Sequence, residues 1–227
     1  MKRDEGPMLQ QVLDFLRALK ANNHREWFEA HRSTYEQARL EFEDLVDTLV
    51  WHIAQRDADI CPLPAREYIY RIYRDMRFVR DGKPYKEHFG AFIAPEGRRS
   101  HSAGYYIHIE ADNSFVAVGT PPIPSLLKPI RHHIVRHADQ WLDVLNDVRL
   151  RSFFPKGIDT ARYRRVPKGV PSDFPHPELV TYRHYAMTHF INDELLQSQE
   201  LVAHVLEVLY ASMPFVRLLR QALAHEA

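Results

Sequence analysis

The spacing of apolar residues predicts that helices fill the first quarter of the chain. Leucine and valine recur every three or four positions over residues 8–20, which is the period of one face of a helix. A short helix over 24–32 and a long helix over 33–56 are predicted next, the latter with a mostly acidic outer face. Pro62 and Pro64 end this region, because proline lacks the amide proton that a helix interior needs.

The middle of the chain changes period and predicts an antiparallel sheet. Aromatic and β-branched residues at 68–73 predict a first strand, and the turn sequence DGKP at 81–84 precedes a second strand at 89–93. Further strands are predicted at 104–110 and 114–119, separated by three residues that fit a hairpin. The short connections favour antiparallel order.

Helices return after the proline-rich run TPPIP. Ser125 is expected to cap one helix, and a second is expected over 138–150 with Val148 among its inward-facing residues. The basic, proline-rich stretch at 153–177 is predicted to be extended or looped, and 179–191 to be a strand that returns to the sheet.

Two helices are predicted to end the chain, and the order of all elements defines a fold class. Ser198 opens the first of the two, and Ser212 caps the second, which starts at Pro214. The elements together predict a single α+β domain over residues 1–227. Its central antiparallel sheet has about four to five strands, packed by N-terminal, middle and C-terminal helices.

Composition places the chain among ordinary soluble proteins. Hydrophobic residues make up 45% and charged residues 26%, and the formal net charge is zero, which gives no global attraction to nucleic acid or membrane. No unbroken run reaches the roughly 18 apolar residues of a membrane span, and the N-terminus lacks the apolar stretch of a signal peptide. We therefore expect a cytoplasmic protein with no membrane partner. One cysteine, Cys61, excludes an internal disulfide.

The charge is unevenly distributed along the chain. Residues 26–59 hold nine acids and three bases, a balance of −6, whereas 66–99 hold nine bases and five acids, a balance of +4. Residues 149–168 hold seven bases and one acid, a balance of +6. Two interpretations stay open: a basic face on a neutral molecule, or acids and bases that pair across the fold.

The densest candidate chemistry lies in the segment YRIYRDMRFVRDGKPYKEHFGAFI, residues 70–93. A basic residue recurs there at every third position from 71 to 86, interleaved with aromatic residues. Arginine forks bind carboxylate or phosphate, and aromatic rings can line or shield such a contact. The ligand-binding candidates are Arg71, Tyr73, Arg74, Arg77, Lys83, Tyr85 and Lys86. His88 is a weak candidate for a catalytic acid or base, because histidine titrates near neutral pH.

Two other stretches add basic residues. The segment GRRSHSAGYYIHIE contributes Arg99 and His101 as further ligand-binding candidates, and its predicted strand projects Tyr106 and His108 on one face. A polar entry to a hairpin is the alternative there. The string RYRRVPKG at 162–169 suits a lid or a second basic wall, or else a solvated loop.

Structural roles compete with these assignments. Arg71 and Arg74 could instead bridge Asp75, Glu67 or the acidic helix in an ion-pair network. His133 and His137 have the i, i+4 spacing of metal ligands, but their motif has no acid, so we expect a polar helix face and no metal. No glycine-rich phosphate loop or dinucleotide-binding fingerprint is present, and we expect no cofactor.

Four stretches resemble one known family. The segment RIYRDMRFVRDGKPYKEHFGAFI is similar to the signature of a bacterial family of conserved, uncharacterised proteins, a domain of unknown function. Further matches are FLRALKANNHREWFEAHRSTYE, GRRSHSAGYYIHIE and RVPKGVPSDFPHPELV, in the family's order from about Leu9 to Leu219. The family commonly has tyrosine where this chain has Ser102. The resemblance implies a single domain and no particular chemistry.

Three functions fit these observations. The first is a domain that binds a small phosphorylated or carboxylated ligand, with catalysis and the ligand's identity left open. The second is a nucleic-acid-binding module with the basic segments in one groove. The third is a protein-interaction scaffold without a small ligand. We favour the first, because the charges cluster while their total stays at zero.

Overall fold

The computed structural model describes residues 9–78 and 80–224, apart from the side chain of Phe78. The predicted helix start at residue 8 and the Phe78 ring lie outside these residues. The chain separates into two compact units. The first consists of the chain up to Arg98 with Tyr106–Val116 and Phe190–Glu207, and the second of Arg99–Tyr105, Ala117–His189 and the chain from Val208 onward. The single-domain organisation stays a prediction.

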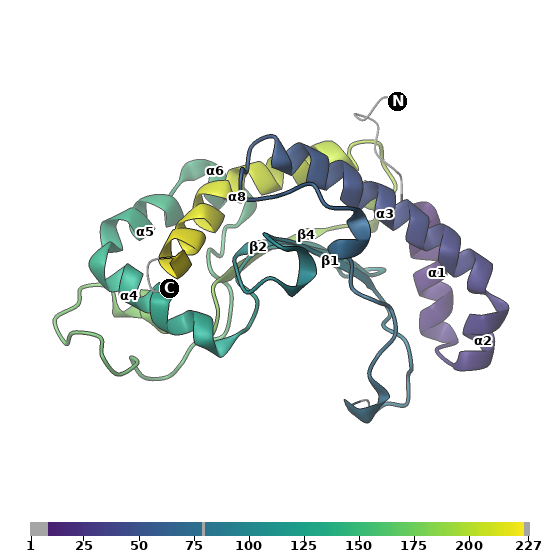
Figure 1. Cartoon of the computed structure of the whole chain (residues 1–227), viewed down its shortest axis with the longest axis horizontal. Coiled ribbons are helices and arrows are strands. Elements are labelled where there is room, and N and C mark those ends of the chain that lie inside the picture. The colour runs from purple at the N-terminus through teal and green to yellow at the C-terminus, as the bar shows by residue number, and fades with distance from the viewer. Residues whose placement is uncertain (1–8, 79, 225–227) are drawn as a thin grey trace. The chain divides into compact units, whose positions relative to one another are not determined.

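The first unit begins with the three predicted helices. They are α1 (Gln10–Ala21), α2 (Arg25–Ala30) and α3 (Arg32–Ala54), coloured purple to blue in Figure 1. Their buried faces meet in an aromatic cluster in which the Phe89 ring lies 6.3 Å from Phe15 and 5.4 Å from Phe42, between centroids. Because Phe89 begins β1, this cluster packs the helices against the sheet.

Four strands form one sheet in the order β1-β2-β3-β4. They are β1 (Phe89–Ile93), β2 (Gly104–Ile109), β3 (Ser114–Gly119) and β4 (Ala186–Ile191). The predicted antiparallel sheet is confirmed. Along β2, Tyr105, Ile107 and Ile109 are buried, whereas Tyr106 and Glu110 on the other face are partly exposed. This alternation places the polar side chains of β2 on a single face of the sheet.

Residues 68–73 are not a continuous strand, so that prediction is wrong. A 3₁₀ turn, η1 (Ala65–Glu67), precedes them, and only isolated pairings join Ile69 to Ala91 and Tyr73 to Tyr85. The segment still runs antiparallel to residues 84–92 and exchanges scattered backbone hydrogen bonds with them. Pro84 cannot donate to a ladder, and the chain bends at residues 87–88, so the pairing stays interrupted.

The second unit contains three short helices. They are α4 (Leu127–Arg136), α5 (Ala138–Leu145) and α6 (Val148–Phe153), with 3₁₀ turns η4 (Pro124–Leu126) and η5 (Pro177–Val180). The predicted helix over 138–150 breaks after Leu145, because the Asp147 side chain accepts the amide proton of Leu150 at 2.8 Å and starts α6. Val148 is 84% exposed, so its predicted inward position is wrong.

Trp141 lies in the core of this unit and contacts His133, one of the two histidines at i, i+4 spacing. Its ring lies 5.9 Å from Tyr185 and 6.4 Å from Phe215 between centroids, and its Nε1 donates to Nδ1 of His133 at 3.0 Å. His133 is buried, so the predicted polar helix face is wrong at this position. Within residues 9–78 and 80–224, no group of three or more His, Cys, Asp or Glu side chains is arranged to hold a metal.

Two predictions near the end of the chain are wrong in their bounds. The strand predicted at 179–191 is confined to Ala186–Ile191, because Pro177 begins the turn η5. A single helix, α8 (Leu201–Ala224), replaces the two predicted ones and contains Pro214 in its interior. Ser212 does not start a helix. It is buried, and its hydroxyl donates to the Leu209 carbonyl at 2.8 Å.

Helix α8 is apolar enough to be compared with a membrane span. It contains an 18-residue window of mean hydropathy 1.4. This window was not predicted from the sequence, because it is not an unbroken run of apolar residues. However, 67% of that window is buried inside the structure, as in the core helix of a soluble protein. The helix α7 (Asp193–Leu196) precedes it.

Candidate anion-binding site

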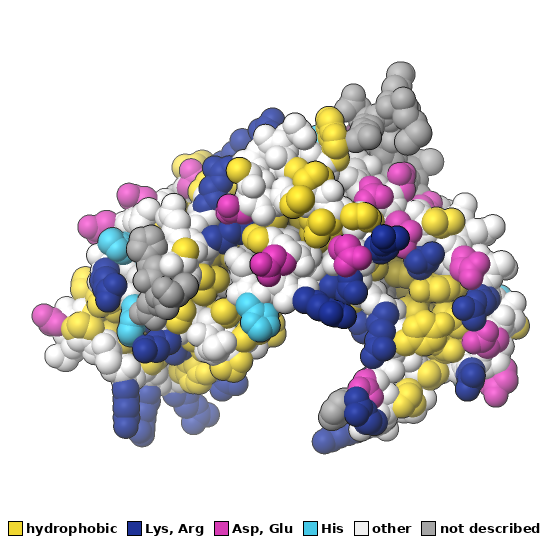
Figure 2. All heavy atoms as spheres, in the orientation of Figure 1, with side chains coloured by type: hydrophobic (Ala, Val, Ile, Leu, Met, Phe, Trp, Pro, Cys, Tyr) yellow, Lys and Arg dark blue, Asp and Glu magenta, His cyan; other side chains and the backbone are white. Residues whose placement is uncertain are grey.

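The basic segment forms a loop whose outer cations are paired with acids. Figure 2 shows Lys and Arg side chains gathered around this loop with acidic side chains among them. Arg74 Nη1 donates to both carboxylate oxygens of Asp81, at 2.9 and 3.0 Å, and to the Lys83 carbonyl at 3.2 Å. Arg77 pairs with Asp75 at 2.7 Å. These contacts close the loop around the turn η2 (Met76–Phe78).

Lys83 and the two predicted tyrosines also have structural contacts. Lys83 Nζ pairs with Glu87 at 2.7 Å. Tyr85 is buried, and its ring stacks on Phe28 with centroids 3.9 Å apart. Tyr73 is 40% exposed at the edge of the same aromatic cluster. The ion-pair interpretation therefore describes Arg74, Arg77 and Lys83 in this structure, although Arg74 pairs with Asp81 and not with the acids that the sequence suggested.

Lys86 and Arg71 differ from Arg74, Arg77 and Lys83. Within the described part of the chain, no carboxylate forms an ion pair with either of them. The Lys86 ammonium lies 5.4 Å from the centroid of the Tyr70 ring, and the Tyr70 hydroxyl is fixed by donating to the Arg98 carbonyl at 3.1 Å. Partial burial, and then the positive charge of Arg71, lower the pKa of Lys86. Two cations thus lie near one another and neither forms an ion pair within the described residues, although the charge of Arg71 contributes to lowering the pKa of Asp75.

Two histidines, His88 and His108, lie next to these cations on one face of the sheet. The His88 ring lies 4.2 Å from His108, which stacks on Phe115 of β3 at 4.5 Å between centroids. Burial, followed by the charges of His108 and Lys86, lowers the pKa of His88 to about 4. His88 is therefore neutral at pH 7, and its ring can accept as well as donate a hydrogen bond.

A hydrogen-bonded chain runs along the same face of β2. The Tyr106 hydroxyl lies 3.1 Å from His108 Nδ1, and His108 Nε2 lies 3.2 Å from a carboxylate oxygen of Glu110. Glu110 must accept from Nε2, so Nδ1 accepts the Tyr106 proton. Burial raises the pKa of Tyr106 to about 12, which keeps the hydroxyl protonated at neutral pH. The chain can carry a proton between Tyr106 and Glu110 through His108.

Gly90 creates the space for Tyr106. A Cβ at Gly90 would lie 2.7 Å from the Tyr106 hydroxyl oxygen, closer than side chains tolerate. Beyond Tyr106 on this face, Phe115 contacts Phe190, which is 63% exposed. The open face therefore offers aromatic surface beside the unpaired cations.

The remaining predicted residues lie elsewhere in the chain. Arg99 and His101 belong to the second unit, with Arg99 at the end of the turn η3 (Gly97–Arg99) and His101 exposed. Their place in the site stays a prediction. Sequence reasoning missed Glu110 and the relay that it completes. The spacing Tyr-x-His-x-Glu on a strand, which puts three polar side chains on one face, is the signal that could have identified it.

The fold and the site define an α+β protein with unpaired cations and a Tyr-His-Glu chain on an open sheet face. A family model described as a conserved hypothetical protein family, DUF2461, matches residues 11–218, and the chain belongs to this family. Neither the curated proteins nor the solved structures contain a significant match.

Proposed function

We propose that this protein binds a small anionic ligand, phosphorylated or carboxylated, at Lys86 and Arg71. The observation that carries the proposal is the environment of the Lys86 ammonium. It is partly buried against Tyr70, its pKa is lowered, and it has no ion-pair partner within the described residues. An anion at this position would remove the repulsion between Lys86 and Arg71 and restore the solvation that burial takes away.

The surroundings support a ligand that also has an uncharged part. Neutral His88 can donate to or accept from ligand oxygens, and the rings of Tyr70 and Phe115 supply flat apolar surface. The paired residues Arg74, Arg77 and Lys83 keep the loop in shape around this position. The family resemblance and the mostly buried helix α8 support a cytoplasmic location in a bacterium.

A thermal-shift screen tests this function. The panel consists of inorganic phosphate, glucose 6-phosphate, ADP, citrate and a single-stranded 12-mer, each at low and moderate salt. A small anion is expected to raise the melting temperature of the wild type and to raise it less in Lys86→Gln. A shift from the 12-mer alone, lost steeply with salt, would instead support the nucleic-acid module. Equal shifts in both proteins for every small anion of the panel would contradict the role of Lys86.

Acid–base catalysis on the bound ligand is a second candidate function. The Tyr106–His108–Glu110 chain favours it, because a carboxylate-oriented histidine in contact with a hydroxyl is an arrangement that transfers protons. Hydrolysis of p-nitrophenyl phosphate and p-nitrophenyl acetate provides a first assay. We expect Tyr106→Phe to lower the turnover while it changes the dissociation constant of the anion by less than about threefold. Absence of turnover above the uncatalysed rate with both substrates would contradict catalysis of these two reaction types.

A further inference from the structure

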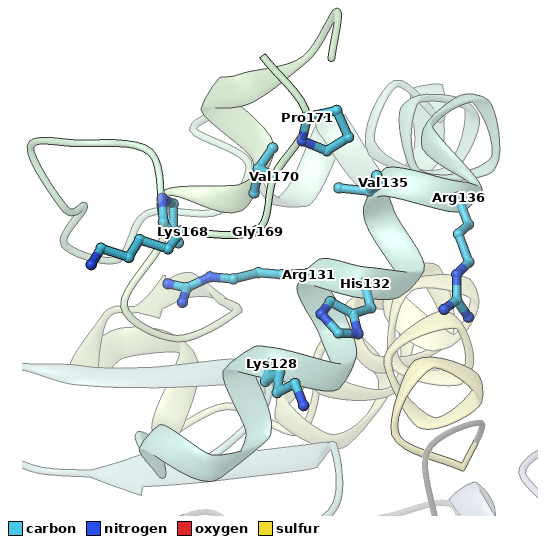
Figure 3. A pocket seen from close by; sticks show the side chains of 10 residues that line it. Lys128, Arg131, His132, Val135, Arg136, Lys168, Gly169, Val170 and Pro171 are labelled. Carbon is cyan, nitrogen blue, oxygen red and sulfur yellow. The ribbon is translucent and has the colours of Figure 1, made fainter. Parts of the chain in front are cut away.

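A cationic cavity lies entirely within the second unit. It has a volume of about 430 Å³ and lies between α4 and the loop at 167–171, which overlaps the basic string noted at 162–169 (Figure 3). This volume is within the range of small-molecule sites in proteins. The basic residues that line it are Lys128, Arg131, His132, Arg136 and Lys168. No acid lines it.

Helix α4 presents these side chains as one stripe. Lys128, Arg131, His132, Val135 and Arg136 follow the spacing i, i+3, i+4, i+7, i+8, which places them on one face of the helix. The sequence of α4, LKPIRHHIVR, contains no Asp or Glu. Like charges at these spacings destabilise a helix. A bound anion would reverse that effect.

Arg131 is held in place by the protein before any ligand binds. Its Nη2 donates to the Tyr182 carbonyl at 3.0 Å, and its guanidinium lies 5.2 Å from the centroid of the Tyr163 ring. Its Nε is buried and has no hydrogen-bond partner, so one donor of a fixed guanidinium is unsatisfied. Figure 3 shows Arg131 extending from α4 toward the turn at Lys168 and Gly169.

The loop on the other side supplies a cation and an apolar wall. Gly169 has a φ of 91°, which favours glycine and lets the chain turn sharply after Lys168. Val170 and Pro171 line the cavity together with Val135 of α4. The cavity therefore combines cations with an apolar surface.

Four of the basic residues that line this cavity have no ion-pair partner among the described residues. Over residues 9–78 and 80–224, no carboxylate forms an ion pair with Lys128, Arg131, Arg136 or Lys168. Surface cations in proteins of zero net charge usually have acids nearby, as Arg74 and Lys83 do in the first unit. Of these four residues only Lys168 comes from the basic stretch 149–168, and the cavity places it opposite the basic side chains of α4.

We propose that this cavity binds a small molecule that carries a phosphate or diphosphate group and an apolar or planar part. The anionic group contacts Arg131 and Lys168, with Lys128 and His132 beside it. The apolar part lies against Val135, Val170 and Pro171. This site is separate in residues and in chemistry from the one at Lys86, and it does not depend on the function proposed there.

Isothermal titration with pyrophosphate and with ADP tests the proposal on the full chain. The test variant is Lys128→Gln/Lys168→Gln, which leaves the structural hydrogen bond of Arg131 intact. The matched control is Lys156→Gln/Arg164→Gln, which removes the same charge from exposed positions of the same unit that do not line the cavity. Circular dichroism and melting curves confirm that both variants fold.

The proposal predicts that ADP binds more tightly than pyrophosphate. It also predicts that the dissociation constant of ADP rises about tenfold or more for the test variant and less than about threefold for the control. A loss of ADP affinity in the Lys128→Gln/Lys168→Gln variant assigns the bound ADP to this cavity, because these substitutions leave Lys86 and Arg71 unchanged. Three results would overturn the proposal: no binding of either probe at low salt, equal losses in test and control variants, or binding of a single-stranded 12-mer alone.

Discussion

His88 is expected to destabilise the protein in mild acid. Burial and the nearby charges of His108 and Lys86 lower its pKa in the folded state from 6.5 to about 4, while Glu110 acts in the opposite direction. Between these two pH values the unfolded chain binds a proton at this residue and the folded chain does not. The free energy of unfolding therefore falls as the pH falls from about 6.5 to about 4.

The size of the effect follows from the two pKa values. Each pH unit between them corresponds to about 1.4 kcal/mol, which gives about 3 kcal/mol for a fully buried ring. His88 is only partly buried. Screening by solvent therefore reduces the expected contribution to about 2 kcal/mol.

Urea unfolding at pH 7.5 and 4.5 measures this contribution. The wild type is compared with His88→Gln, which cannot titrate, and with His101→Gln, which alters an exposed histidine. We expect the wild type to lose about 2 kcal/mol more than His88→Gln between the two pH values, and His101→Gln to follow the wild type. If His88→Gln loses as much stability in acid as the wild type, the ring is solvated in the folded protein and the reasoning is wrong.

Three other substitutions have defined outcomes. Gly119→Ala is expected to lower the free energy of unfolding by about 3 kcal/mol or more, because φ is 137° and a Cβ would overlap the Tyr185 carbonyl; a loss below about 1 kcal/mol in urea unfolding would contradict this. Arg74→Gln should lower the free energy of unfolding only slightly, because the Asp81 carboxylate that it pairs with is exposed to solvent, and should leave the dissociation constant of the anion within about threefold in calorimetry; a larger loss of affinity would place Arg74 in the site. Pro214→Ala should raise the melting temperature by a few degrees, because α8 regains a backbone hydrogen bond, and a lower melting temperature would show that the helix depends on proline there.

The sequence pattern predicts an element correctly where the spacing of its apolar residues and the turn residues at its ends indicate the same bounds. Residues 89–93 and 114–119 are strands as predicted, because their apolar composition and the turn residues on both sides point to the same bounds. Pro214 was misassigned because proline is common at helix starts. In α8 the apolar faces on both sides of it are buried, and that packing outweighs one missing hydrogen bond.

The sequence identifies the basic segment that contains the candidate site, but not which of its cations are paired with acids. Lys83 and Lys86 are alike in sequence, three positions apart in one basic run. They differ in the structure because Lys83 reaches Glu87 whereas Lys86 lies over Tyr70, a distinction set by the bends of the loop. Arg74 pairs with Asp81 because the turn of the loop places the Asp81 carboxylate next to the Arg74 guanidinium. Sequence spacing contains no information on such contacts across a loop.

The most direct test of the proposed function compares Lys86 with Lys83. Calorimetric titration with the small anion whose thermal shift falls most in Lys86→Gln would be carried out on the wild type, Lys86→Gln and Lys83→Gln. Both variants lose one positive charge from the same loop. We predict that Lys86→Gln raises the dissociation constant about ten- to a hundredfold, the range expected for a lost charge-assisted contact. Lys83→Gln is predicted to change it less than about threefold, because Lys83 is already paired with Glu87. Equal changes in the two variants would contradict a specific anion site at Lys86.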